Sequence, residues 1–179
     1  MKILLVYPYC LEDRIQAENV ESMPIGIYYL AALLKEENYD VEIVNWQKLG
    51  RSPGEIRALL MEKKADVIGF SILQANRWGG IQIARVAKQL DPQVKIVFGG
   101  ITATALWKHF LGHFPEIDFV VRGEGEYTFL SLIRCLEHNE GNKKGAIPGL
   151  AYRQNNRPVR TREAERIHEL DALPNTAKY

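Results

Sequence analysis

The sequence has few cysteines and almost no net charge. Its 179 residues include only two cysteines, Cys10 and Cys135. Because these lie far apart, the chain has neither a disulfide framework nor the closely spaced ligands of a metal site. The formal net charge of +1 gives no reason to expect a surface that binds nucleic acid or membranes.

Long hydrophobic runs are also missing. The apolar opening at residues 1–7 is stopped by Pro8, so it is too short for a signal sequence, and no run approaches the roughly 20 residues of a membrane span. A cytoplasmic protein is therefore the expectation. Hydrophobic residues make up 46% of the chain and charged residues 25%, which is ordinary for a soluble globular protein.

Short apolar runs alternate with segments of helical periodicity. Apolar runs predict strands at 2–7, 41–46, 66–71, 94–98 and 118–121, and apolar residues at helical spacing predict helices at 25–37, 53–63, 77–90, 104–113 and 125–137. Ser52 and Glu55 form a capping-box pattern at the start of the second helix. Strands that alternate with helices predict an α/β fold, a doubly wound, Rossmann-like sheet of five parallel strands.

The C-terminal part of the chain has a different pattern. Residues 139–145 are polar and predict a boundary loop, which divides the chain into an α/β domain at 1–140 and an extension at 141–179. Within the extension, residues 149–153 and 157–160 flank Asn155 and Asn156, which predicts a β-hairpin because asparagine tolerates a positive φ. The tail at 161–179 has few apolar residues and is interpreted as a linker.

The ends of the third and fourth strands are the best candidates for a binding site. Open parallel sheets bind ligands beyond the carboxyl ends of their strands. Ser71 offers a hydroxyl there, and Gly99 with Gly100 offers backbone without side chains, which a flat ligand can approach closely. Taken alone, these residues also fit a strand that simply ends in serine and a glycine pair that turns the chain. In combination, a serine-x-leucine (Ser71, Leu73) followed at this distance by a glycine pair resembles the cobalamin-binding domain.

Further stretches match one family. The chain resembles the amino-terminal domain of cobalamin-dependent radical S-adenosylmethionine enzymes in residues 98–104 and 114–126, in Pro24-x-Gly26-x-x-Tyr29-Leu30-Ala31, in the hairpin from Gly149, and in Leu170-Asp171-x-Leu173-Pro174. The resemblance implies that the corrin ring lies over the carboxyl edge of the sheet and that its nucleotide tail enters a slot between the sheet and a helix. It implies contacts to cobalamin from Ser71, Leu73, Gln74, Asn76, Gly99, Gly100, Ile101, Thr102, Gly123, Glu124, Gly125 and Glu126.

The stretch Arg122-Gly123-Glu124-Gly125-Glu126 is physically suited to bind a ligand. Its glycines free backbone amides, and the amino end of the helix that follows carries a partial positive charge. Its two glutamates can accept hydrogen bonds from a ligand. For Glu126, stabilisation of the helix start is an equally good explanation.

The loop after the first strand departs from related families. Cobalamin-dependent mutases and methionine synthases carry Asp-x-His-x-x-Gly there, and the histidine binds cobalt. In this chain, residues 8–15 include no histidine, so the resemblance implies base-off cobalamin without a histidine ligand. Cys10 can act as a soft axial ligand or as a small core thiol, and the core thiol is the simpler interpretation.

The three-cysteine motif of radical S-adenosylmethionine enzymes is absent as well. Two isolated cysteines cannot hold a 4Fe–4S cluster, and no catalytic pair is visible. We therefore expect a domain that binds cobalamin for methyl transfer or radical rearrangement on another domain. That catalytic domain would bind the 4Fe–4S cluster and S-adenosylmethionine.

Two other functions suit the same topology. A signalling receiver needs an aspartate where this chain has Ser71, although Glu12 and Asp13 imitate its acidic pair. A nucleotide- or flavin-binding module would use the same strand ends without a corrinoid. Uptake of hydroxocobalamin separates cobalamin binding from both.

Overall fold

The computed structural model describes residues 1–11, 24–169 and 173–176. Within these residues one sheet has seven strands in the order β2-β1-β3-β4-β5-β6-β7. The strands are β1 (Lys2–Tyr7), β2 (Asp40–Asn45), β3 (Val67–Ser71), β4 (Lys95–Gly99), β5 (Phe119–Val121), β6 (Leu150–Gln154) and β7 (Arg157–Arg160). The helices are α2 (Ile25–Glu36), α3 (Pro53–Lys63), α4 (Arg77–Leu90), α5 (Ile101–His113) and α6 (Glu126–Glu137), with 3₁₀ turns η1 (Trp46–Lys48) and η2 (Lys143–Ala146).

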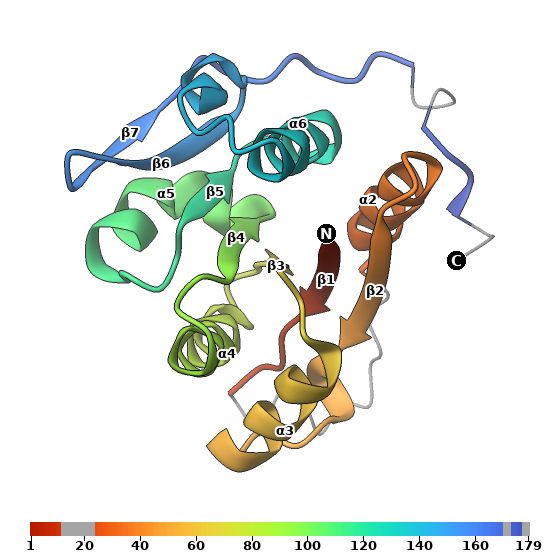
Figure 1. The fold of residues 1–179 in the computed structure, drawn as a ribbon, viewed down its shortest axis with the longest axis vertical. Coiled ribbons are helices and arrows are strands. Elements are labelled where there is room, and N and C mark those ends of the chain that lie inside the picture. The colour runs from red at the N-terminus through yellow and green to blue at the C-terminus, as the bar shows by residue number, and fades with distance from the viewer. Residues whose placement is uncertain (12–23, 170–172, 177–179) are drawn as a thin grey trace.

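The five strands from β1 to β5 are parallel, as the sequence predicts. Successive residues of β1 point to opposite faces of the sheet, so Leu4 and Val6 belong to one core while Ile3 and Leu5 belong to the other. Helices α3, α4 and α5 cover the first core, and α2 and α6 cover the second (Figure 1). Burial on both faces explains why these strands are continuous apolar runs.

The hairpin extends the same sheet. Strand β6 pairs antiparallel with β5, and β7 pairs antiparallel with β6. Asn155 and Asn156 turn the chain with φ of 49° and 61°, which confirms the predicted role of asparagine. The division of the chain after residue 140 stays a prediction.

Several element boundaries differ from the predicted ones. Helix α5 begins at Ile101, three residues before the predicted start, because Gly100 has φ of 91° and turns the chain directly from β4 into the helix. Strand β2 ends at Asn45, whose side chain accepts a hydrogen bond from Gln47 N and starts a 3₁₀ turn. The capping box at Ser52 and Glu55 is confirmed, since both reciprocal hydrogen bonds are present.

Two predicted features fall on other parts of the chain. The loop after β1 with Glu12 and Asp13, and part of the Leu170-Asp171-x-Leu173-Pro174 motif, lie outside the described residues. Among the described helices, none has the length and apolar composition that crossing a lipid bilayer requires.

Candidate cofactor site

The carboxyl ends of β3 and β4 lie side by side, as predicted. Ser71 and Gly99 are paired residues of the two strands. Directly beyond them, Ile72 N donates a hydrogen bond to Gly99 O at 2.8 Å, and Thr102 N donates one to Ile72 O at 3.3 Å. The serine and the glycine pair that the sequence predicts as a binding site are therefore neighbours.

A cavity of about 300 Å³ opens beside these strand ends. Its lining residues place it on one face of the sheet. Helices α2 and α6 cover that face (Figure 1). Seven of the predicted site residues line it: Ser71, Gly99, Gly100, Gly123, Glu124, Gly125 and Glu126. The position of the cavity agrees with the predicted slot between the sheet and a flanking helix.

Glycine and apolar side chains form most of the inner surface. Nine further residues, which the sequence did not mark as site residues, also line the cavity: Leu5, Gly26, Ile27, Leu30, Gly69, Phe70, Val97, Val121 and Phe129. Gly69 lies inside β3, and a glycine inside a strand often marks a close approach. A Cβ at Gly69 would lie 3.0 Å from both Leu5 Cδ2 and Phe129 Cζ, so glycine lets these side chains pack at the base of the cavity.

The two glycines at the end of β4 have different roles. A Cβ at Gly99 would approach no heavy atom closer than 3.8 Å, so Gly99 leaves free space next to the cavity. A Cβ at Gly100 would lie 2.9 Å from Ile72 O, and its φ of 91° is one that other residues rarely adopt. The chain's own backbone therefore requires glycine at position 100, whereas the sequence interpretation assigned both glycines to ligand space.

One polar group of a lining residue lacks a partner. Ser71 and Glu126 both line the cavity, and within the described part of the chain the buried Oε2 atom of Glu126 has no hydrogen-bond partner. Glu126 is the first residue of α6, where the helix dipole favours a carboxylate. Buried polar atoms are nearly always satisfied, so the cavity suits a ligand that supplies hydrogen-bond donors and acceptors.

Five predicted site residues do not line the cavity. Asn76 is fully buried and bonds to the chain itself: its Oδ1 accepts from Leu73 N at 2.8 Å, and its Nδ2 donates to Ser71 O at 3.1 Å. Thr102 is buried at the start of α5. The other three are exposed just beyond the strand ends, namely Leu73, Gln74 and Ile101. Their predicted contacts to a corrin ring stay predictions.

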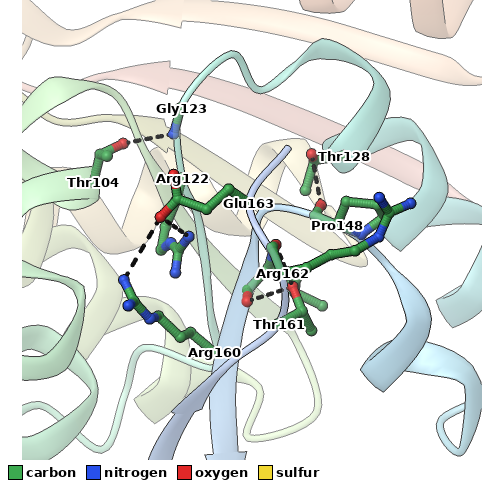
Figure 2. A network of polar contacts seen from close by, with 10 residues as sticks. Thr104, Arg122, Gly123, Thr128, Pro148, Arg160, Thr161, Arg162 and Glu163 are labelled. Atoms are coloured by element: carbon green, nitrogen blue, oxygen red, sulfur yellow. Dashed lines mark hydrogen bonds and ion pairs between the residues drawn. The ribbon is translucent and has the colours of Figure 1, made fainter. Parts of the chain in front are cut away.

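The loop of residues 122–126 lies at the carboxyl end of β5 (Figure 2). Gly123 has φ of 74°, and its N–H donates to Thr104 Oγ1 at 3.0 Å. Arg122 is only 5% exposed and its Nη2 lies 3.4 Å from Glu163 Oε1. Burial, with Arg160 nearby, lowers the pKa of Arg122, and Glu163 partly offsets that effect. Glu124 accepts a hydrogen bond from Ile167 N, so this predicted ligand contact also has a partner within the chain.

The helices on either side of the cavity are tied together at their far ends. The Tyr39 hydroxyl, just after α2, donates to Glu137 Oε2 at 2.8 Å. Arg134 Nη2 of α6 donates to Glu37 Oε2 at 2.6 Å. These bonds link the carboxyl-terminal ends of α2 and α6.

The family of the chain follows from comparison with known proteins. The model of the B12-binding domain family matches residues 19–133, which is more than half of the chain. This chain belongs to the B12-binding domain family. The family predicted from the residues around Ser71, Gly99 and the loop at 122–126 is confirmed.

Curated relatives are longer than this chain. It is 29% identical over 174 residues to an uncharacterized methyltransferase of Pyrococcus horikoshii. The alignment covers 97% of this chain and 37% of that protein. It is 30% identical over 176 residues to an anaerobic magnesium-protoporphyrin IX monomethyl ester cyclase of Synechocystis. That alignment covers 96% of this chain and 34% of the cyclase. The chain therefore spans about a third of the length of these relatives.

Solved structures share the fold. The radical S-adenosylmethionine methyltransferase TsrM from Kitasatospora setae, with cobalamin and a 4Fe–4S cluster bound, aligns with a TM-score of 0.72 at 20% identity, over 97% of this chain and 31% of TsrM. The cobalamin-dependent S-adenosylmethionine radical enzyme OxsB with aqua-cobalamin bound aligns with a TM-score of 0.73 at 18% identity, over 92% of this chain and 23% of OxsB. The α/β fold predicted from the sequence is confirmed.

Proposed function

We propose that this chain binds cobalamin and holds its nucleotide tail in the cavity beside β3 and β4. The observation that carries the proposal is a cavity at the carboxyl ends of the central strands, lined by Ser71, Gly99 and Glu126, whose Oε2 atom is buried without a hydrogen-bond partner in the described part of the chain. Membership of the B12-binding domain family supports this choice of ligand.

The residues of the cavity fit the chemistry of that tail, which is a flat aromatic base on a ribose phosphate. The apolar walls, with Leu5, Val97 and Phe129, suit an aromatic base. Gly99 leaves room for the base to approach the backbone. The carboxylate of Glu126 suits a hydroxyl donor such as that of the ribose.

The protein's part in the chemistry is to hold and orient the cofactor. When bound, cobalamin supplies a cobalt ion in a corrin ring that serves methyl transfer or radical chemistry. We propose that cobalt is held base-off without a histidine ligand. In support, residues 8–23 contain no histidine, and none of the described residues that line the cavity is a histidine.

We further propose that the domain serves a radical S-adenosylmethionine catalytic domain. TsrM and OxsB align with this chain over less than a third of their own length, and the sequence relatives include enzymes named as methyltransferases. We propose methyl transfer or radical rearrangement as the reaction on that domain, since the sequence relatives include cyclases as well as methyltransferases.

The test is uptake of hydroxocobalamin by the 179-residue chain. The protein is incubated with the corrinoid and desalted, and the corrin absorption that it retains is measured. Gly99→Phe should abolish uptake, because the new side chain enters a space with no atom closer than 3.8 Å to the Cβ position. Gly54→Phe on α3 is the matched control, since its Cβ meets nothing within 4 Å and it lies away from the cavity.

Two results contradict the proposal. One is a wild-type chain that retains no corrinoid, and the other is a folded Gly99→Phe variant that retains as much as Gly54→Phe. A parallel incubation with flavin mononucleotide tests the alternative ligand class. Retention of the flavin without the corrinoid would assign the cavity to a flavin instead.

A further inference from the structure

The loop of residues 122–126 borders two cavities. The first is the proposed cofactor cavity. The second, of about 490 Å³, lies between α6 and the chain after β7. We call residues 161–169 the post-hairpin segment, and most of them line this second cavity. Glu124 lines both cavities.

The post-hairpin segment begins at Thr161, which is bonded to Leu150 of β6, and three contacts hold the residues that follow. Gly149 N donates to Arg162 O at 2.8 Å. The Glu163 carboxylate lies between the guanidinium groups of Arg122 and Arg160, at 3.4 and 3.7 Å (Figure 2). Further along, Ile167 N donates to Glu124 Oε2.

These contacts restrain the segment in different ways. Glu163, like Glu124, is exposed, whereas its partner Arg122 is only 5% exposed. The Glu163 contacts are long, at 3.4 and 3.7 Å, and they hold only a side chain. Glu124 accepts its bond from the backbone N–H of Ile167, so it fixes the main chain of the segment. Glu124 is therefore the contact by which the loop of the first cavity sets the path of the chain at residue 167.

The second glutamate of the loop has a separate role. Glu126 has a buried, unpartnered Oε2 atom in the first cavity and does not line the second. Glu124 and Glu126 are two residues apart, yet one accepts a bond from the post-hairpin segment and the other lines only the first of the two cavities. This division allows the two functions to be tested separately.

We propose that Glu124 is a positioning residue that couples cofactor occupancy of the first cavity to the placement of the post-hairpin segment. The inference rests on the proposed function, because cobalamin is taken as the occupant. A ligand in the first cavity restrains the carboxylate that lines it, and that carboxylate holds Ile167. Coupling of this kind is reciprocal, so an ordered segment must also tighten cobalamin binding. Cofactor loading would thereby set the direction in which the chain leaves the domain.

Hydrogen exchange with and without hydroxocobalamin measures this coupling. The 179-residue chain is exchanged in deuterated buffer, and peptides that cover residues 162–169 are analysed by mass spectrometry. Saturating cobalamin should slow exchange of the Ile167 amide about fivefold, the lower end of usual coupling between sites.

Three variants separate the contributions. Glu124→Ala removes the acceptor, so the Ile167 amide should exchange about tenfold faster and lose its response to cobalamin. Glu124→Gln keeps an acceptor oxygen, so it should restore the slow exchange of the Ile167 amide and its response to cobalamin. Glu126→Ala should weaken cobalamin uptake while the cofactor-free exchange rate of Ile167 stays at the wild-type value.

Two outcomes overturn the coupling while cobalamin binding stands. One is wild-type protein that is loaded with cobalamin but shows unchanged exchange at residues 162–169. The other is Glu124→Ala protein that keeps the cobalamin-dependent slowing. Failure of the wild-type chain to take up cobalamin, which its absorption spectrum reports before any exchange measurement, overturns the proposed function and this inference together.

Discussion

Ser71 and Gly99 are paired as the last residues of β3 and β4, and both line the same cavity. Gly69 lies two residues before Ser71 in β3, and Val97 lies two residues before Gly99 in β4, and these two residues also line the cavity. Because side chains alternate along a strand, all four positions belong to one face of the sheet. The pairing therefore places a hydroxyl beside backbone that carries no side chain, at the mouth of a space that α2 and α6 cover.

Ser71→Ala should weaken cobalamin binding without weakening the fold. Ser71 lines the cavity, and the hydrogen bond that it accepts from Asn76 Nδ2 uses its backbone carbonyl, which the substitution keeps. Loss of one hydrogen bond to the ligand should lower affinity about fivefold, or about 1 kcal/mol. Titration with hydroxocobalamin measures the affinity, and urea denaturation measures the stability.

Ser131→Ala is the matched control, because Ser131 lies on α6 and lines the second cavity. It should change neither quantity. A Ser71→Ala variant that loses stability as well as affinity would show that the hydroxyl supports the fold.

Gly100→Ala should destabilise the protein. The backbone at Gly100 has φ of 91° and ψ of 177°, a region almost confined to glycine, and other residues there cost about 1–3 kcal/mol. The new Cβ would also lie 2.9 Å from Ile72 O. We expect the free energy of unfolding to fall by at least the lower part of that range. Gly99→Ala is the comparison, since its Cβ has ordinary contacts, and equal losses in the two variants would refute the prediction.

The parts of the fold that depend on local pattern could be predicted from the sequence. The residues of α4 follow a clear helical spacing, and the predicted range 77–90 agrees with the structure. The adjacency of Ser71 and Gly99 was also predictable, because consecutive βαβ units place their strand ends at one edge of the sheet. The start of α5 was not, since it depends on the backbone angles of Gly100.

The lining of the cavity depends on contacts between distant segments. Leu5 of β1, Leu30 of α2 and Phe129 of α6 meet there only because two helices pack against one face of the sheet. No local pattern marks these residues as different from other core positions. The partners of Asn76 and Glu124 were missed for a related reason, because a polar residue near a site can bond to the chain as well as to a ligand.

Asn76→Ala should unfold more easily than the wild type. The fully buried amide bonds to Leu73 N and Ser71 O, and its removal leaves two part-buried backbone groups without this partner. Such losses cost about 1–3 kcal/mol. Gln74→Ala, at an exposed neighbour that the sequence assigned to the same ligand, should change stability by less than about 0.5 kcal/mol. Urea denaturation of both variants measures the two losses in the free energy of unfolding. If Asn76 only contacted ligand and did not support the fold, both losses would be small.

Tyr39 should give the stability of the protein a specific alkaline dependence. Burial first, and then the hydrogen bond to Glu137, raise the pKa of Tyr39 from 10.0 to about 12. The folded chain therefore keeps the phenol proton at pH values where the unfolded chain has lost it. The stability from Tyr39 should be complete below pH 10 and lost as pH rises through about 12.

Tyr39→Phe removes the hydrogen bond that ties the end of α2 to Glu137 at the end of α6. The variant should lose about 1 kcal/mol at neutral pH, and its stability should fall less steeply than that of the wild type as the pH rises above 10. Lysine and the other tyrosines titrate in both proteins, so the difference between the two denaturation series isolates Tyr39. Tyr127→Phe, at a half-exposed position of α6, is the control and should follow the wild type. Parallel curves for wild type and Tyr39→Phe across this range would mean that the Tyr39–Glu137 bond does not hold the two cavity helices in solution.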